Sequence, residues 1–250
     1  MARRANALKK EKSSAANVLV LDAGSSLVGD ELSNKTEGKV MVEAMGMLGY
    51  QAMAVGGSDF ALGREALLER AREAGFAILS ANLVDASSQE AVLPAYTVVE
   101  TGGRKVAVIG LTGPADLVPG EPGSLRIIDP ISALRQAVNY LNGRADAIVV
   151  LAHVDSDWDR RLAAEVPGVA AIIAGGQYLP DQRPWVAPQT GTVVVHPGAQ
   201  GEHLGVLNLH VDHDGRAISA TWKSIALTSD FPDDPSVTDL VNRWRAKTEE

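Results

Sequence analysis

Polar residues and glycines recur directly after short apolar runs in this sequence. Carboxylate, amide and imidazole groups are the ligands that hydrolytic metal sites use. Glycines leave backbone N–H groups open, as an anion-binding turn requires. The residue types therefore indicate a metal site or an anion site, built from Asp22-Ala23-Gly24-Ser25, Gly56-Gly57-Ser58-Asp59, Ser80-Ala81-Asn82, His153-Val154-Asp155 and Gly175-Gly176-Gln177-Tyr178.

The elements that carry these residues follow from the spacing of apolar positions. Apolar runs predict strands, and stretches with helical spacing separate them, which is typical of a parallel or mixed sheet covered on both faces. In such sheets ligands bind at the carboxyl ends of the strands. The strands are predicted at 17–24, 51–57, 76–82, 146–153 and 169–176, and the helices at 37–50, 63–74, 130–143 and 156–165.

The remaining segments complete a single domain over residues 1–250. Gly102-Gly103 predicts a hairpin within 96–113, and residues 192–198, 204–212 and 215–227 predict further strands before a helix at 235–248. The Pro- and Gly-rich residues 176–191 predict a loop. The basic N-terminus favours an exposed helix, with a targeting or RNA-binding arm and disorder as the alternatives. We expect two packed layers of sheet with helices outside.

Composition excludes several classes of protein. Lys and Arg total 23 against 31 Asp and Glu, a net charge of −8, which argues against a general nucleic-acid binder. The absence of cysteine excludes disulfides, thiolate metal sites and cysteine nucleophiles. The sequence contains no apolar run long enough to predict a membrane span and no apolar region behind the N-terminal arginines, so we expect neither a span nor a signal peptide.

The order of motifs resembles the N-terminal domain of the 5′-nucleotidases, within the calcineurin-like metallophosphoesterases. The resemblance runs over about residues 2–247 through LDAG, EAMGMLGYQAMAVGGSDFALG, ILSAN, YTVVETGGRKVAVIGLT, VVLAHVDSD, VPGVAAIIAGG and PGAQGEHLG. It implies an α/β sandwich of two mixed sheets flanked by helices. It also implies metal-dependent hydrolysis of phosphoesters such as nucleotides, with Mn, Zn or Mg as the divalent ion. Members of the family are usually periplasmic or extracellular.

Few of the family's metal ligands recur in this sequence. The Asp-x-His of the first strand would precede Met1, so that strand is expected to be missing. Ser25 occupies the position of the bridging aspartate, and Gly57 and Ser58 those of an asparagine and a histidine. Gly176 and Tyr178 occupy the positions of two further histidines.

The resemblance therefore leaves His153 and Asp59 as vestigial metal ligands and catalytic residues. It also suggests a substrate-binding role for Gly56, Gly57, Ser58 and Asn82. One imidazole cannot hold two divalent ions, so we expect no dinuclear centre and an inactive enzyme. Alternative roles are a histidine held by a hydrogen bond for His153 and a cap for Asp59.

Three functions remain open from the sequence. The first is a pseudoenzyme that binds a phosphorylated small molecule or a nucleotide. The second is an active hydrolase with a rearranged or mononuclear site, in which Asp155 or Asp22 would assist His153 and Asp59. The third is a structural or binding module of a larger exported protein, with a protein partner or missing flanking segments. We also expect no C-terminal nucleotidase domain to follow.

Overall fold

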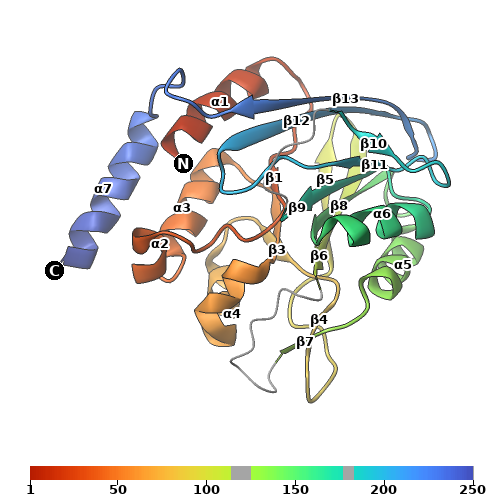
Figure 1. The fold of residues 1–250 in the computed structure, drawn as a ribbon, viewed down its shortest axis with the longest axis horizontal. Coiled ribbons are helices and arrows are strands. Elements are labelled where there is room, and N and C mark those ends of the chain that lie inside the picture. The colour runs from red at the N-terminus through yellow and green to blue at the C-terminus, as the bar shows by residue number, and fades with distance from the viewer. Residues whose placement is uncertain (114–124, 177–182, 250) are drawn as a thin grey trace.

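A six-stranded mixed sheet forms the centre of the protein, as a computed structural model shows (Figure 1). The structure describes residues 1–113, 125–176 and 183–249. The strand order is β10-β11-β9-β8-β6-β5, in which β6, β8, β9 and β11 run parallel. The strands are β5 (Tyr96–Thr101), β6 (Arg104–Thr112), β8 (Ala147–His153), β9 (Ala171–Gly175), β10 (Trp185–Val186) and β11 (Val193–Val195).

The predicted hairpin is confirmed and forms one edge of this sheet. β5 and β6 pair antiparallel through the full length of β5. The turn uses Gly102 and Gly103 at φ values of 57° and 72°, a region that residues with a side chain rarely adopt.

A second, three-stranded parallel sheet packs against the inner face of the first. Its order is β1 (Leu21–Asp22), β2 (Ala52–Ala54) and β3 (Ala77–Leu79). The contact is apolar, with Ala54 and Leu79 packed on Val108 and Leu151. At Gly110 the two sheets approach so closely that an added Cβ atom would lie 2.5 Å from the Leu79 carbonyl oxygen.

Helices cover both outer faces. α5 (Pro130–Leu141) and α6 (Ser156–Glu165) bury apolar side chains against the six-stranded sheet, while α3 (Lys39–Leu48) and α4 (Gly63–Glu73) pack beyond the three-stranded one. Side chains set where these helices begin: Asp129 and Asp155 accept backbone N–H groups of the first turns of α5 and α6. The segment that leads into α4 is the 3₁₀ helix η1 (Gly57–Leu62), and the short α2 (Glu31–Lys35) precedes α3.

A long hairpin and the terminal helices close the domain. β12 (His203–Val211) and β13 (Ala217–Ala226) lie across the inner face of β9 and β11, where Leu207 and Trp222 pack. α1 (Ala2–Ser13) and α7 (Pro235–Glu249) lie side by side at one end (Figure 1). A small antiparallel pair, β4 (Leu83–Asp85) with β7 (Leu125–Ile127), lies on the side away from the β12–β13 hairpin (Figure 1).

Several predictions need correction. The N-terminal helix is not exposed, because Ala5, Ala7 and Leu8 are buried. The segment 176–191 is not wholly a loop, since it contains β10. The strand predicted at 17–24 pairs with a neighbour only over Leu21–Asp22. No helix among the described residues is both long and apolar enough to cross a membrane.

Candidate functional site

The carboxyl ends of the parallel strands in the six-stranded and three-stranded sheets meet at one edge of the two-sheet core. His153 lies at the centre of this edge. It is the last residue of β8, where it pairs in register with Gly175 of β9. Leu151 points to the inner face and Ala152 to the outer one, so the alternation of the strand directs the half-buried His153 inward. We call the surrounding turns the glycine rim: Gly24-Ser25, Gly56-Gly57-Ser58, His153 and Gly175-Gly176.

Backbone from three turns closes around the imidazole. A Cβ atom added at Gly56 would lie 2.5 Å from Ser25 Oγ and 2.6 Å from His153 Cδ2. Those two atoms are therefore at most 5.1 Å apart. At Gly175 an added Cβ would lie 2.7 Å from the carbonyl oxygen of Ala23 and 3.1 Å from His153 Cδ2. His153 thus occupies a site whose walls admit only glycine at these two positions.

Asp59 is completely buried and joins two turns of the rim. One carboxylate oxygen accepts the N–H groups of Ser25 at 2.9 Å and Gly56 at 3.0 Å, and the other accepts that of Leu27 at 2.9 Å. Burial raises the pKa of this carboxyl to about 6, although the three N–H groups act in the opposite direction. The contact with Gly56 agrees with the capping role considered from the sequence, and the carboxylate holds the turns together.

The other two carboxylates near the rim are also used by nearby groups of the chain. Asp22 Oδ1 accepts the N–H of Gly24 at 2.9 Å and the hydroxyl of Ser26 at 2.7 Å. Asp155 Oδ1 accepts two N–H groups at the start of α6. Both side chains therefore shape the turns that follow β1 and β8.

Two serines of the glycine rim, Ser25 and Ser58, lie close together. The N–H of Ser58 donates to Ser25 Oγ at 3.2 Å. The hydroxyl oxygen of Ser58 is buried and has no hydrogen-bond partner among the described residues. A buried hydroxyl without a partner loses hydrogen-bonding energy that a ligand or a water molecule would restore.

Asn82 lies inside the protein, where main-chain groups form hydrogen bonds with its side-chain amide. Its side-chain nitrogen donates to the carbonyl oxygens of Thr112 at 2.7 Å and Ile128 at 3.2 Å. Its side-chain oxygen accepts the N–H of Thr112 at 2.9 Å. The side chain is completely buried and links β6 to the segment before α5.

A cavity of about 1,550 Å³ extends from the glycine rim between the inner sheet face and β12. We call it the inter-sheet cavity. Asp22, Ser58 and His153 line its rim end, and Thr101 and Arg104 of the β5–β6 turn line the other end. Arg4 of α1 also reaches it and donates to the Tyr50 hydroxyl at 3.4 Å. The sequence pattern predicted neither the cavity nor a role for Arg4.

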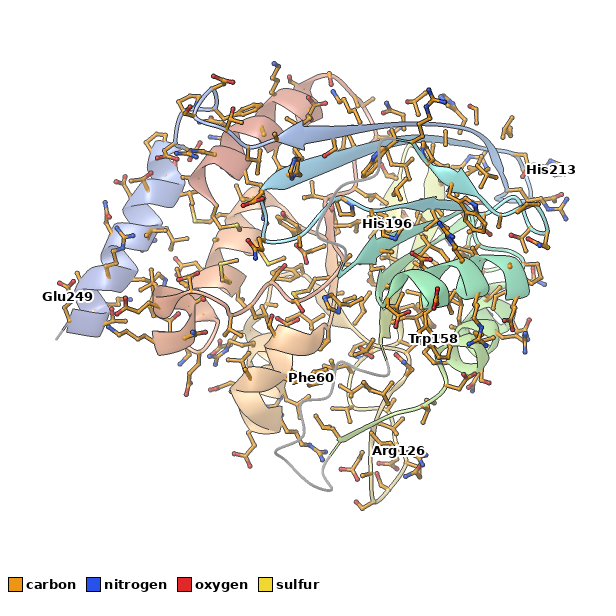
Figure 2. The ribbon with its side chains drawn as sticks, in the orientation of Figure 1. Phe60, Arg126, Trp158, His196, His213 and Glu249 are labelled. Carbon is orange, nitrogen blue, oxygen red and sulfur yellow. The ribbon has the colours of Figure 1, made fainter. Side chains whose placement is uncertain are left out.

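The described residues of the rim do not fit a pair of divalent ions. They offer the His153 imidazole, serine hydroxyls and the half-buried Asp22, while Asp59 is inaccessible and Gly57 and Gly176 have no side-chain donor. Tyr178 lies outside the described residues. Within the described ranges, the one carboxylate and histidine cluster with metal-binding spacing is Asp212-His213-Asp214, at the β12–β13 turn. Figure 2 shows His213 at the periphery of the molecule.

A second histidine site, which the sequence did not indicate, lies on the outer face of the six-stranded sheet. His196, which is labelled in Figure 2, follows β11. Its Nε2 lies 2.5 Å from a carboxylate oxygen of Asp159 of α6. Asp159 is completely buried, and its second carboxylate oxygen has no partner among the described residues. The signal in the sequence is weak, because 37 residues separate the two side chains.

Comparison with known proteins relates nearly the whole chain to proteins named 5′-nucleotidase. No family model matches the sequence. The chain is 31% identical to the human 5′-nucleotidase over 254 residues, which are 92% of the chain and 44% of that protein. It is 30% identical to the snake venom 5′-nucleotidase of Crotalus adamanteus, over 98% of the chain and 46% of that protein. The chain thus spans about half the length of these curated relatives.

Solved structures agree with this relationship. The 5′-nucleotidase precursor from Thermus thermophilus superposes with a TM-score of 0.86 at 27% identity, over 99% of this chain and 53% of that one. The calcineurin-like phosphoesterase YfkN from Bacillus subtilis has the same fold, with a TM-score of 0.85 at 21% identity over 99% of this chain and 89% of that one. The predicted α/β sandwich is confirmed.

Proposed function

Because this chain is a 5′-nucleotidase-like domain with the calcineurin-like phosphoesterase fold, we propose that it binds a phosphorylated small molecule, such as a nucleotide, at the glycine rim without hydrolysing it through a metal pair. The observation that carries the proposal is the buried hydroxyl of Ser58, which has no partner among the described residues and belongs to a residue that lines the same cavity as His153.

Three features support the binding of an anion at the rim. Gly57 and Gly176 carry no side chain, which lets a phosphate approach the backbone of these turns closely, whereas the N–H of the neighbouring Gly56 is bonded to Asp59. The Ser58 hydroxyl can donate to a phosphate oxygen. The His153 imidazole can donate as well, and it carries a positive charge when protonated.

The set of side-chain donors at the rim supports the proposed absence of two-metal chemistry. A pair of divalent ions roughly 3.5–4 Å apart needs several carboxylate and imidazole ligands. Here Asp59 bonds to two turns, and the resemblance implies that Ser25, Gly57, Ser58 and Gly176 stand where the family has side-chain ligands. The domain would retain the binding half of the ancestral reaction.

Titration calorimetry with AMP and with inorganic phosphate tests the binding proposal. We expect Ser58→Ala to weaken binding about tenfold, the effect of one lost hydrogen bond of about 1.4 kcal/mol. The matched control is Ser219→Ala at an exposed position of β13 and should bind as the unmodified chain does. If neither ligand binds, or if Ser58→Ala binds as tightly as the control, the binding proposal is wrong.

Metal content and phosphate release test the chemical proposal. The protein is loaded with manganese or zinc, desalted and analysed by mass spectrometry, and then assayed for release of phosphate from AMP. We expect neither a tightly held pair of ions nor turnover. Two ions per chain, lost in His153→Ala together with phosphate release, would establish an active hydrolase with a rearranged site instead.

A further inference from the structure

The turn between α5 and β8 carries the one Asn-Gly dipeptide of the sequence, Asn142-Gly143. Asn142 caps the C-terminal end of α5, and Gly143 follows at a φ of 70°, as is common where a helix ends. Both residues are exposed to solvent. An asparagine before a glycine is chemically labile, because the nitrogen of the next residue can close a ring on the side-chain amide and glycine has no Cβ atom to hinder it.

The two groups that would react are not held by other groups of the protein. Among the described residues, no group accepts the N–H of Gly143 or forms a hydrogen bond with the side-chain amide of Asn142. The turn is closed instead by the N–H of Arg144, which donates to the carbonyl oxygen of Leu141 at 2.9 Å. Apart from its chain neighbours, no described atom lies within 4 Å of a Cβ added at Gly143, so the surroundings leave room for ring closure.

Ring closure requires a local opening of the turn. Asn142 has a ψ of 124°, which directs the nitrogen of Gly143 away from the side chain, so the Cα–C bond of Asn142 must rotate first. Helix ends open at a lower free-energy cost than the core, because few buried contacts hold them. Leu141 is buried, whereas Asn142, Gly143 and Arg144 are exposed. The rotation can therefore occur while the core stays folded.

We propose that Asn142 is a site of spontaneous deamidation, with water as the co-reactant. The nitrogen of Gly143 bonds to Cγ of Asn142, and the side-chain amide leaves as ammonia with the proton of that nitrogen. Water then adds to either carbonyl of the resulting succinimide and breaks its bond to the ring nitrogen. The products are aspartate and isoaspartate, in which the main chain passes through the former side chain and is longer by one carbon atom.

The modification changes the end of α5. Either product places a carboxylate beside the last carbonyl groups of the helix, where the helix dipole disfavours negative charge. Isoaspartate also lengthens the main chain between Leu141 and Arg144, whose hydrogen bond closes the turn. The turn precedes β8, and His153 of the glycine rim is the last residue of that strand, so ligand binding at the rim should not change.

Peptide mapping of the full chain tests the proposal. The protein is kept folded at neutral pH for several weeks and cleaved with trypsin, which releases residues 136–144 as one peptide. This peptide also contains the exposed Asn139 of α5, which Tyr140 follows. Because Tyr140 hinders the attacking nitrogen, we expect deamidation at Asn142 to be about tenfold faster or more, a difference of about 1.4 kcal/mol in the barrier. Methylation by an isoaspartyl methyltransferase with S-adenosylmethionine identifies the isoaspartate.

Two variants complete the test. Gly143→Asn introduces a side chain beside the nitrogen and tolerates the left-handed region, so it should slow the reaction about tenfold. Asn142→Gln would have to close a larger ring and should leave this position unmodified. Equal deamidation at Asn139 and Asn142, or an unchanged rate in Gly143→Asn, overturns the proposal. Deamidation of Asn142 in the urea-unfolded chain alone overturns it as well, since the folded turn would then protect the site.

Discussion

Replacing Gly56 by alanine adds one methyl group beside His153. Gly56 has φ and ψ values of −125° and 178°, which any residue adopts, so backbone strain does not arise. The cost is steric, because the new Cβ would lie 2.5 Å from Ser25 Oγ and 2.6 Å from His153 Cδ2 and Cγ. Overpacking of this kind costs about 1–3 kcal/mol, since neighbouring side chains must leave their preferred positions.

Gly46 provides the matched control. It lies inside α3, and apart from its chain neighbours and the backbone of its own helix no described atom lies within 4 Å of a Cβ added there. Alanine at this position should stabilise the protein by about 1 kcal/mol, because glycine is a poor helix former. The two identical substitutions are therefore expected to differ by about 2–4 kcal/mol in the free energy of unfolding.

Urea unfolding followed by circular dichroism measures this difference. For a chain of this size, each kcal/mol also shifts the melting temperature by about 2–4 °C. The double variant Gly56→Ala, Ser25→Gly removes one of the two clashing groups, so the two substitutions should be non-additive and recover part of the loss. A Gly56→Ala protein as stable as the unmodified chain would refute the close packing of the imidazole described for the rim.

Two other predictions concern buried polar groups. The pKa of Asp59 lies at about 6 in the folded protein against 3.8 ordinarily, so protonation of this carboxyl favours the folded state. This contribution is complete below about pH 4, and up to about 3 kcal/mol of the free energy of unfolding is lost as the pH rises to 7. Urea titrations should show this dependence on pH in the unmodified chain and in the exposed control Asp239→Asn, and its loss in Asp59→Asn. Asn82→Ala removes three hydrogen bonds to buried main-chain groups and should cost about 2–4 kcal/mol. Calorimetry then separates this structural role from the substrate contact predicted from sequence, for which ligand affinity would fall while stability stayed intact.

The longer elements could be predicted because each carries its own periodic pattern. The helix at 156–165 has the predicted bounds, and the strands β8 and β9 differ from prediction by one or two residues at their ends. Short elements depend on distant partners, which a sequence does not reveal. β4 and β7 pair although about forty residues separate them in the chain, and β1 ends where its pairing with β2 ends.

The same distinction between local pattern and distant partners applies to the candidate site. The rule for strand ends places His153 and the glycine turns together, as the structure does. The direction of each side chain depends on hydrogen bonds between segments far apart in the chain. For that reason the inward location of Asn82 and the three N–H groups on Asp59 could not be predicted from residue type and position.

The close approach at Gly110 gives the molecule two mechanically different parts. The six-stranded and three-stranded sheets touch through backbone there, so neither sheet can slide past the other without a main-chain clash. The β12–β13 hairpin, in contrast, contacts β9 and β11 through side chains such as Leu207 and Trp222. The turn of the hairpin makes a backbone approach of its own, because a Cβ atom added at Gly215 would lie 2.4 Å from the carbonyl oxygen of Asp146. Side-chain contacts can loosen one at a time, so heating should loosen the strands of the hairpin early, while their turn and the pair of sheets keep their spacing. The strands β12 and β13, on one side of the inter-sheet cavity, are therefore the more easily deformed part of the protein, and the two packed sheets are the rigid part.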